Sequence, residues 1–206
     1  MSRYFKALSA ERRLLTVSAL IFIISGILGY ANSEAIQSTL EETPFWSQLQ
    51  QISEGIKKDP SFLHVFSTIF LNNLKAAVVM IGLGIFFCFF PIMALLSNGM
   101  ILGVVLGNVS AETGVHPLKV FVTSILPHGI LELPAIIIAA AFGIRLGINF
   151  GRWLFSWASP AIKERSRRDW ILLFERIPTV MVGIVLLLFV AAIIESSLIL
   201  FMMTKG

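Results

Sequence analysis

The chain has 206 residues, of which 56% are hydrophobic and 14% charged, and its mean hydropathy is +0.86. A water-soluble domain carries closer to a quarter charged residues, so this composition excludes an ordinary globular protein. The net charge of +4 would suggest a nucleic-acid partner in a soluble chain, but here the basic residues are sorted between loops. We therefore expect one all-α, polytopic membrane domain over residues 1–206, with about five transmembrane helices in a lipid bilayer and no nucleic acid among its partners.

The first apolar run, from Leu14 to Ala31, follows a basic N-terminal stretch. A signal peptide is one interpretation, because small residues such as Gly29 occupy the usual cleavage positions. The run is longer than a typical signal core, so we prefer a retained helix. Its basic start then predicts a cytoplasmic N-terminus.

Residues 32–66 form a net acidic loop, which we expect to be extracytoplasmic. Within this loop, apolar residues recur at three- and four-residue spacing, and they are Phe45, Trp46, Leu49, Ile52 and Ile56. Such spacing predicts an amphipathic helix at the outer interface. The helix either packs on the end of the bundle or serves as a docking surface for an extracytoplasmic partner.

From Phe66 to Gly107 the chain is almost continuously apolar. This length fits two crossings, which we expect to turn between about Phe90 and Gly99. Asn72 and Asn73 lie near the outer end of the first crossing, where asparagines hydrogen-bond between helices. We therefore expect these asparagines to stabilise helix packing through such hydrogen bonds.

Two rows of small residues at four-residue spacing mark helix faces that another backbone can approach closely. The rows are Gly99, Gly103 and Gly107, then Ala135, Ala139, Gly143 and Gly147. The rows either pack against each other or join two copies of the chain in a homodimer.

The most informative stretch is residues 125–146, where His128 and Glu132 lie four apart in an apolar segment. Inserting such ionisable groups costs roughly 2.5–3.5 kcal/mol each, so they usually face a partner or a water-filled cavity. Two prolines and Gly129 bracket the pair, which predicts a broken helix. The apolar run before the pair is too short to cross alone. Residues 117–134 are therefore either a kinked continuation of one helix or a re-entrant half-helix.

Residues 147–177 are rich in arginine and lysine, which predicts a cytoplasmic segment. Residues 178–203 form the last crossing, and this crossing contains Glu195. Five crossings from a cytoplasmic N-terminus place the C-terminus outside the cell membrane.

The sequence contains none of the complete catalytic motifs for zinc peptidases, serine hydrolases or nucleotide binding. His128 and Glu132 could supply two metal ligands, but a zinc site needs three or four, so we expect no cofactor and no enzymatic activity. Other candidate partners for this pair across the bundle are Lys75, Asn73 and Asn98. The alternative is a small proton- or ion-coupled transporter or channel subunit that uses this pair and Glu195, because broken helices with midplane acids serve such carriers.

Several short motifs recur along the apolar part, namely Asn72-Asn73, Asn98-Gly99 with Gly103, Pro127-His128-Gly129 with Glu132, and Gly143 before the basic segment. Together they resemble the stage II sporulation protein M family, over residues 66–206 and more loosely before them. The resemblance implies a multi-pass membrane scaffold that, in endospore formers, anchors extracytoplasmic peptidoglycan-remodelling enzymes during engulfment of the forespore. It also implies that the cell-wall hydrolases are partners and that the chain is not itself the hydrolase.

Overall fold

The computed structural model of the protein describes residues 3–156 and 160–204. All regular structure in this part of the chain is helical, which confirms the all-α prediction. The elements in chain order are α1 (Arg3–Ala10), α2 (Arg12–Ala31), α3 (Ser33–Glu41), α4 (Pro44–Lys58), α5 (Phe62–Gly82), η1 (Leu83–Ile85), α6 (Phe89–Thr113), α7 (Pro117–Val120), η2 (Phe121–Ile125), α8 (Leu126–Leu154) and α9 (Pro160–Met203).

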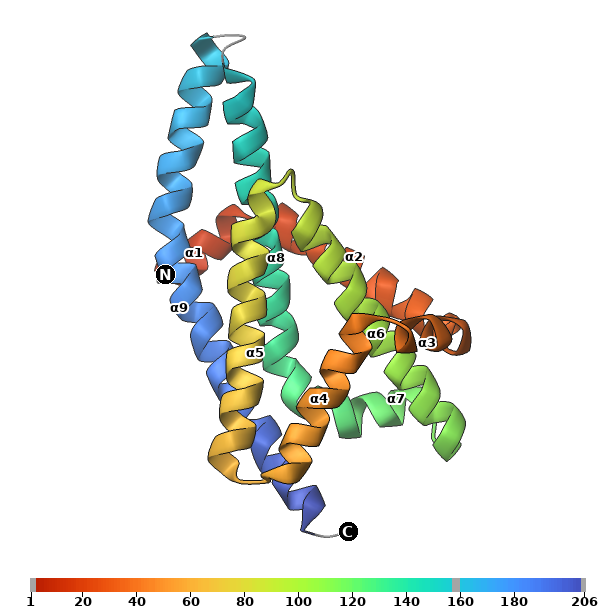
Figure 1. Ribbon diagram of the computed structural model, residues 1–206. Helices are drawn as coiled ribbons and strands as arrows, with labels where there is room; N and C mark the ends of the chain where they lie inside the picture. Colours follow the sequence, from red (N-terminus) through yellow and green to blue (C-terminus); the bar gives the residue numbers. More distant parts are fainter. Residues whose placement is uncertain (1–2, 157–159, 205–206) are drawn as a thin grey trace.

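Five of the described helices are long and apolar enough to cross a membrane, namely α2, α5 with η1, α6, α8 and α9. The prediction of a polytopic membrane protein is therefore confirmed. Helix α9 has 44 residues. At the usual helical rise this is about 66 Å, roughly twice the thickness of the hydrocarbon core. Its charged first half and the end of α8 extend past the other helices as a hairpin (Figure 1).

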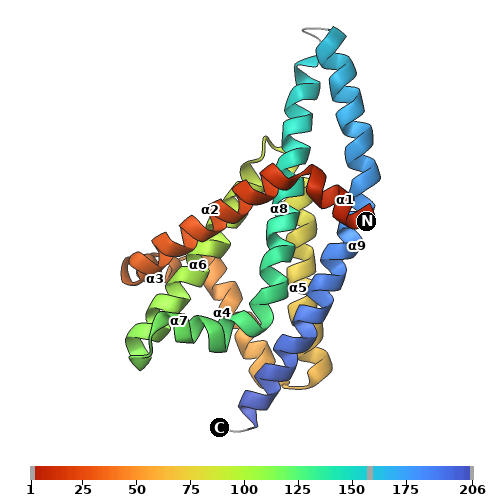
Figure 2. The ribbon, with the colours of Figure 1, turned by 180° about the vertical axis from the view of Figure 1, so that it is seen from behind.

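The crossing helices form two groups. Helices α5, α8 and α9 stand side by side, while α2 and α6 form a pair that leans away from them (Figures 1 and 2). The main core lies where α8 meets its neighbours, and its largest fully buried side chains include Phe142, Leu95 and Ile184.

The first row of small residues holds α6 against α2. A Cβ atom added at Gly103 would lie 2.6 Å from the backbone nitrogen of Tyr30, and one added at Gly107 would lie 3.3 Å from the carbonyl oxygen of Tyr30 and 2.6 Å from Ser33 Oγ at the start of α3. Gly99 meets the backbone of Phe22 in the same way. The two backbones therefore touch along α6, as the four-residue spacing predicts. The partner of this row is α2 and not the second row.

The second row faces the connection between α5 and α6. Ala135 and Ala139 are fully buried. A Cβ atom added at Gly143 would lie 2.6 Å from the carbonyl oxygen of Met80, and one at Gly147 would lie 2.6 Å from the backbone nitrogen of Cys88. Both rows are thus used within one chain, and the expectation that they pack on each other is wrong. Neither row is left free to form a homodimer.

The turn between the second and third crossings lies at η1 and the residues after it, not between Phe90 and Gly99 as the sequence suggested. Phe87 and Cys88 adopt left-handed backbone conformations, with φ of 51° and 66°. Phenylalanine and cysteine seldom adopt this conformation, so neither residue predicts a turn at this position. Gly99, which looked like part of the turn, is a packing residue inside α6.

The segment before α8 is a continuous helical run, so of the two alternatives for residues 117–134 the structure has the kinked continuation of one helix. Helix α7 leads through η2, a π-helical stretch, into α8, and Pro134 lies inside α8. The run lies across the end of the bundle and then turns into α8 (Figures 1 and 2). The predicted break at residues 117–134 is thus a change of direction without loss of helix, because a π-turn absorbs it. Residues 117–125 do not cross as a helix of their own.

The acidic loop is built from α3 and α4, which agrees with the predicted amphipathic helix. Asn108 of α6 hydrogen-bonds to Gln37 of α3. The side chains of Phe45, Trp46 and Leu49 lie outside the described part of the structure. Ile56, near the end of α4, packs against a small cluster formed by α5 and α9. The helix therefore touches the end of the bundle at its C-terminal turn.

The sequence analysis did not anticipate α1. This short helix joins α2 at Glu11 and packs against α9 (Figure 2). Ala7 is buried, whereas Phe5 and Lys6 are exposed. An amphipathic helix in this position is typical of the membrane interface.

Candidate functional site: two polar clusters between helices

The first polar cluster lies among the three packed helices α5, α8 and α9, within the apolar part of the bundle. The side chain of Asn73 in α5 lies near the carboxyl group of Glu132 in α8. The carboxyl group of Glu195 is close enough to Glu132 for the two to interact electrostatically. Both glutamates are partly buried, so the two carboxyl groups lie near each other in a region of low dielectric constant.

Local sequence explains why these side chains point inward. Glu132 lies three residues before the fully buried Ala135, and Glu195 lies three residues after the buried Ala192. Residues three apart share one face of a helix, so each glutamate belongs to the face that its helix turns toward the bundle. Gly129 is also buried on this part of α8.

The remaining motif residues are distributed differently. His128 lies in α8 by its backbone, but its side chain is outside the described part of the structure, so its pairing with Glu132 stays a prediction. Asn72 and Lys75 are exposed. Asn98 is exposed on α6 and donates to the carbonyl oxygen of Ala94, at 2.8 Å, within its own helix. The structure thus brings Asn73, Glu132 and Glu195 together, while Asn98 bonds within α6.

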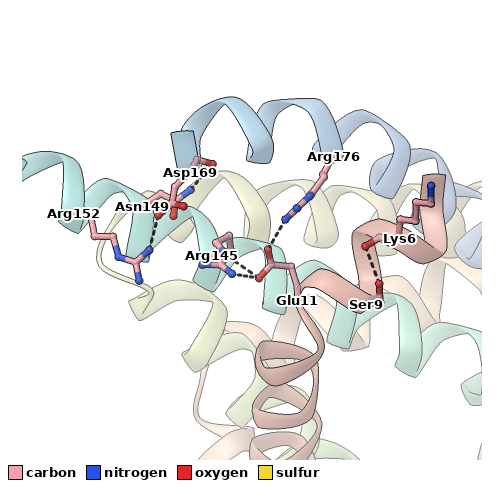
Figure 3. Close-up of polar contacts among 8 residues, drawn as sticks. All are labelled: Lys6, Ser9, Glu11, Arg145, Asn149, Arg152, Asp169 and Arg176. Carbon is pink, nitrogen blue, oxygen red and sulfur yellow. Dashed lines mark hydrogen bonds and ion pairs between the residues drawn. The ribbon is translucent and has the colours of Figure 1, made fainter. Parts of the chain in front are cut away.

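The second polar cluster lies at the level of α1, and the sequence analysis missed it (Figure 3). Glu11, at the joint of α1 and α2, is only 2% exposed. Its carboxylate accepts a hydrogen bond from Nε of Arg145 in α8, at 2.7 Å, and one from Nη1 of Arg176 in α9, at 3.1 Å. We call these three residues the arginine node. One buried carboxylate therefore ties together the joint and two other helices.

A second ion pair extends the node along α8 and α9 (Figure 3). Arg152 Nη1 lies 2.6 Å from Asp169 Oδ2, and Asn149 Nδ2 donates to the backbone carbonyl of Asp169 at 3.2 Å. Asn149 is fully buried, and its Oδ1 has no hydrogen-bond partner among the described residues. A cavity of about 50 Å³ beside it is lined by Arg145, Asp169 and Glu11. This space and these polar groups suit one or two buried water molecules.

A single signal could have found the node. Glu11 is the one acid in a stretch with Arg3, Lys6, Arg12 and Arg13, and it lies immediately before an apolar helix. In a membrane protein, an isolated acid in that position needs a cationic partner from another helix. The sequence contains many arginines between residues 145 and 176, so their spacing does not reveal which two are used.

The two clusters suit different chemistry. The carboxyl pair in the bundle can hold a proton or a cation, since intramembrane acids commonly line ion pathways. The arginine node fixes helices to one another by charged hydrogen bonds. Among the described residues, no three of the histidine, cysteine, aspartate and glutamate side chains converge as a metal site would require.

The family model described as stage II sporulation protein M matches residues 16–198. The chain belongs to this family. The match includes Asn73, Glu132 and Glu195, and it begins after α1 and Glu11. The stage II sporulation protein M resemblance suggested by the sequence motifs is therefore confirmed.

Two uncharacterized proteins of Methanocaldococcus jannaschii are similar to the chain. One is 30% identical over 112 residues, which cover 54% of this chain and 62% of the relative. The other is 27% identical over 192 residues, which cover 91% of this chain and 82% of the relative. The first match thus spans less than two thirds of that relative. No solved structure matches the chain.

Proposed function

We propose that the chain is a non-enzymatic membrane scaffold that anchors extracytoplasmic peptidoglycan-remodelling enzymes, and that in a sporulating host it does so during engulfment of the forespore. Membership of the stage II sporulation protein M family carries this proposal. In this role the chain positions hydrolases and has no catalytic group of its own.

The proposed docking surface is the pair α3 and α4. These helices lie between the first two crossings, and the exposed acidic side chains of the two helices and the turn between them are Glu34, Glu41, Glu42 and Glu54. Helix α4 touches the bundle at its end, and most of its length lies apart from α5, α8 and α9 (Figure 1). A charged surface of this kind suits a basic partner, because charge complementarity steers association.

The proposed orientation follows from charge. The α8–α9 hairpin carries the basic segment and extends past the C-terminal end of α5, while the C-terminal end of α4 and the C-terminus of the chain lie at the opposite end of the bundle (Figure 1). By the positive-inside rule the hairpin and N-terminus are cytoplasmic, and α3, α4 and the C-terminus are extracytoplasmic.

A pull-down from native membranes tests the scaffold. The tagged wild type is compared with Glu34→Gln/Glu41→Gln/Glu42→Gln, and co-purifying proteins are identified by mass spectrometry. The matched control removes charge at the other end, with Arg165→Gln/Arg168→Gln. We expect extracytoplasmic hydrolases with the wild type and the control, and their loss with the acidic-loop variant. Cleavage of peptidoglycan by the purified chain alone would contradict the proposal.

A second candidate function is ion- or proton-coupled transport, and the two partly buried carboxyl groups of Glu132 and Glu195, which lie near each other in the bundle, favour it. In proteoliposomes, a carrier would move protons or a monovalent cation, and Glu132→Gln or Glu195→Gln would abolish this flux. Glu112→Gln, at an exposed position near the end of α6, is the matched control. Sealed vesicles without flux of any tested ion would remove this candidate and leave the scaffold.

A further inference from the structure

Two cavities adjoin beside α1, because Thr179 of α9 lines both of them. The first has a volume of about 520 Å³ and is lined by charged side chains of α1 and α9. The second has a volume of about 690 Å³ and follows the apolar face of α9 from Val182 to Val190, with Leu131 of α8 on its other side. Helix α1 contributes Tyr4 to the apolar cavity and Lys6 to the charged one.

The charged cavity is basic. It contains Arg3, Lys6 and Arg176, against the single carboxylate of Glu175. Arg3 and Lys6 are exposed. Arg176 donates to Glu11 through Nη1, and a guanidinium group has five N–H donors, so Arg176 retains donors for a further acceptor. The cavity therefore offers three cationic groups and the Thr179 hydroxyl to an anion.

The position of the two cavities matches the boundary of a bilayer. Helix α9 is charged up to Arg176 and then has no charged residue from Val180 to Ile194. The amphipathic helix α1 lies across it at this level (Figure 2). The basic cavity is consequently at the depth of lipid headgroups, and the apolar cavity lies in the hydrocarbon beneath it.

We propose that the two cavities together bind one anionic phospholipid. The phosphate group lies in the basic cavity, where Arg3, Lys6 and Arg176 neutralise it and Thr179 donates a hydrogen bond. An acyl chain follows the apolar cavity along Val182 to Val190. Basic pockets between helices on the cytoplasmic side are known to hold such headgroups, and arginine suits phosphate oxygens because its planar fork can donate two parallel hydrogen bonds.

Native mass spectrometry of the full chain in detergent, titrated with phosphatidylglycerol or phosphatidylcholine, tests the proposal. We expect one phosphatidylglycerol to bind in preference to phosphatidylcholine. Arg3→Gln/Lys6→Gln should weaken phosphatidylglycerol binding about 30-fold. Each of the two basic residues strengthens the attraction to an anionic headgroup by about fivefold, and the two factors multiply. The matched control Arg165→Gln/Arg168→Gln removes the same charge from exposed positions of α9 and should change binding less than about twofold.

A variant in the apolar cavity tests the acyl chain separately. Leu186→Trp fills this cavity at a position that is 59% exposed, so it should fold normally and still weaken binding of the lipid. If the Arg3→Gln/Lys6→Gln variant does not fold, Leu186→Trp alone tests whether the lipid binds in the two cavities. Three results would each overturn the proposal: equal affinity for the two lipids, equal weakening by the control, or displacement of the lipid by inorganic phosphate at equal concentration. None of these results bears on recruitment of hydrolases, so this proposal and the scaffold can fail separately.

Discussion

Removing the carboxylate of the arginine node should destabilise the whole fold. Glu11→Gln keeps the size of the side chain but leaves Arg145 and Arg176 without their shared negative charge. The Glu11 side chain is 1% exposed, whereas those of Arg145 and Arg176 are 25% and 29% exposed. The variant therefore leaves two arginines that can partly regain water.

The exposure of the two arginines determines how much unfolding free energy the Glu11→Gln variant loses. Breaking a buried ion pair by removing one partner costs about 3–5 kcal/mol when the remaining charge stays buried. Partial hydration of the two guanidinium groups places the expected loss at the lower end, about 3 kcal/mol. For a chain of this length, such a loss lowers the midpoint of thermal unfolding by about 6–12 °C.

Thermal unfolding of the purified protein in one detergent, followed by tryptophan fluorescence, measures this loss. Glu112→Gln is the matched control, because it removes an exposed acid from the end of α6. A double-mutant cycle with Arg145→Gln then isolates the pair, and the two substitutions together should cost less than the sum of their separate effects. A Glu11→Gln midpoint within about 1 °C of the wild type would refute the account of the node.

Two further predictions concern the crossing helices. Gly103→Leu should prevent accumulation of folded protein, because a side chain there meets the α2 backbone, whereas Gly82→Leu should be tolerated because no atom lies within 4 Å of its added Cβ; size-exclusion chromatography distinguishes them, and a monodisperse Gly103→Leu protein would contradict the packing. Glu195→Gln should raise the midpoint of thermal unfolding by about 2–4 °C, because an ionisable side chain costs free energy inside an apolar helix bundle and the amide of the same size carries no charge. A midpoint lowered by this substitution would contradict that account.

The sequence predicted the crossings because hydrophobic length is a direct physical requirement of a bilayer. It misplaced the turn after α5, because the two residues that take up left-handed conformations are Phe87 and Cys88, and neither is a residue type that usually does so. It left open whether residues 117–134 continue into the next helix with a kink or re-enter, and the structure has the continuation, since one π-turn can redirect a helix while its hydrogen bonding continues. Periodicity identifies a helix, but the direction in which a helix leaves a turn depends on its neighbours.

The candidate sites divide in the same way. Glu132 and Glu195 were noticeable because each is an acid in an apolar run, but only the packing of α8 on α9 brings them together. The two glycine rows were recognisable by spacing, while their partners were not, because a small residue says only that some backbone comes close. Glu11 was overlooked because its partners lie more than 130 positions away in the chain.

The arginine node and the lipid cavities depend on each other through α1. Glu11 fixes the joint at which α1 leaves α2, and this joint sends α1 across α9 (Figures 2 and 3). Tyr4 of α1 then packs against Gly183, where an added Cβ would lie 2.7 Å from Cζ of the tyrosine ring and nearer still to Cε2. Arg176 belongs both to the node and to the basic cavity. If the node breaks, α1 is no longer fixed against α9. The two cavities then lose the lining that Arg3, Tyr4 and Lys6 supply, so the lipid site depends on the arginine node.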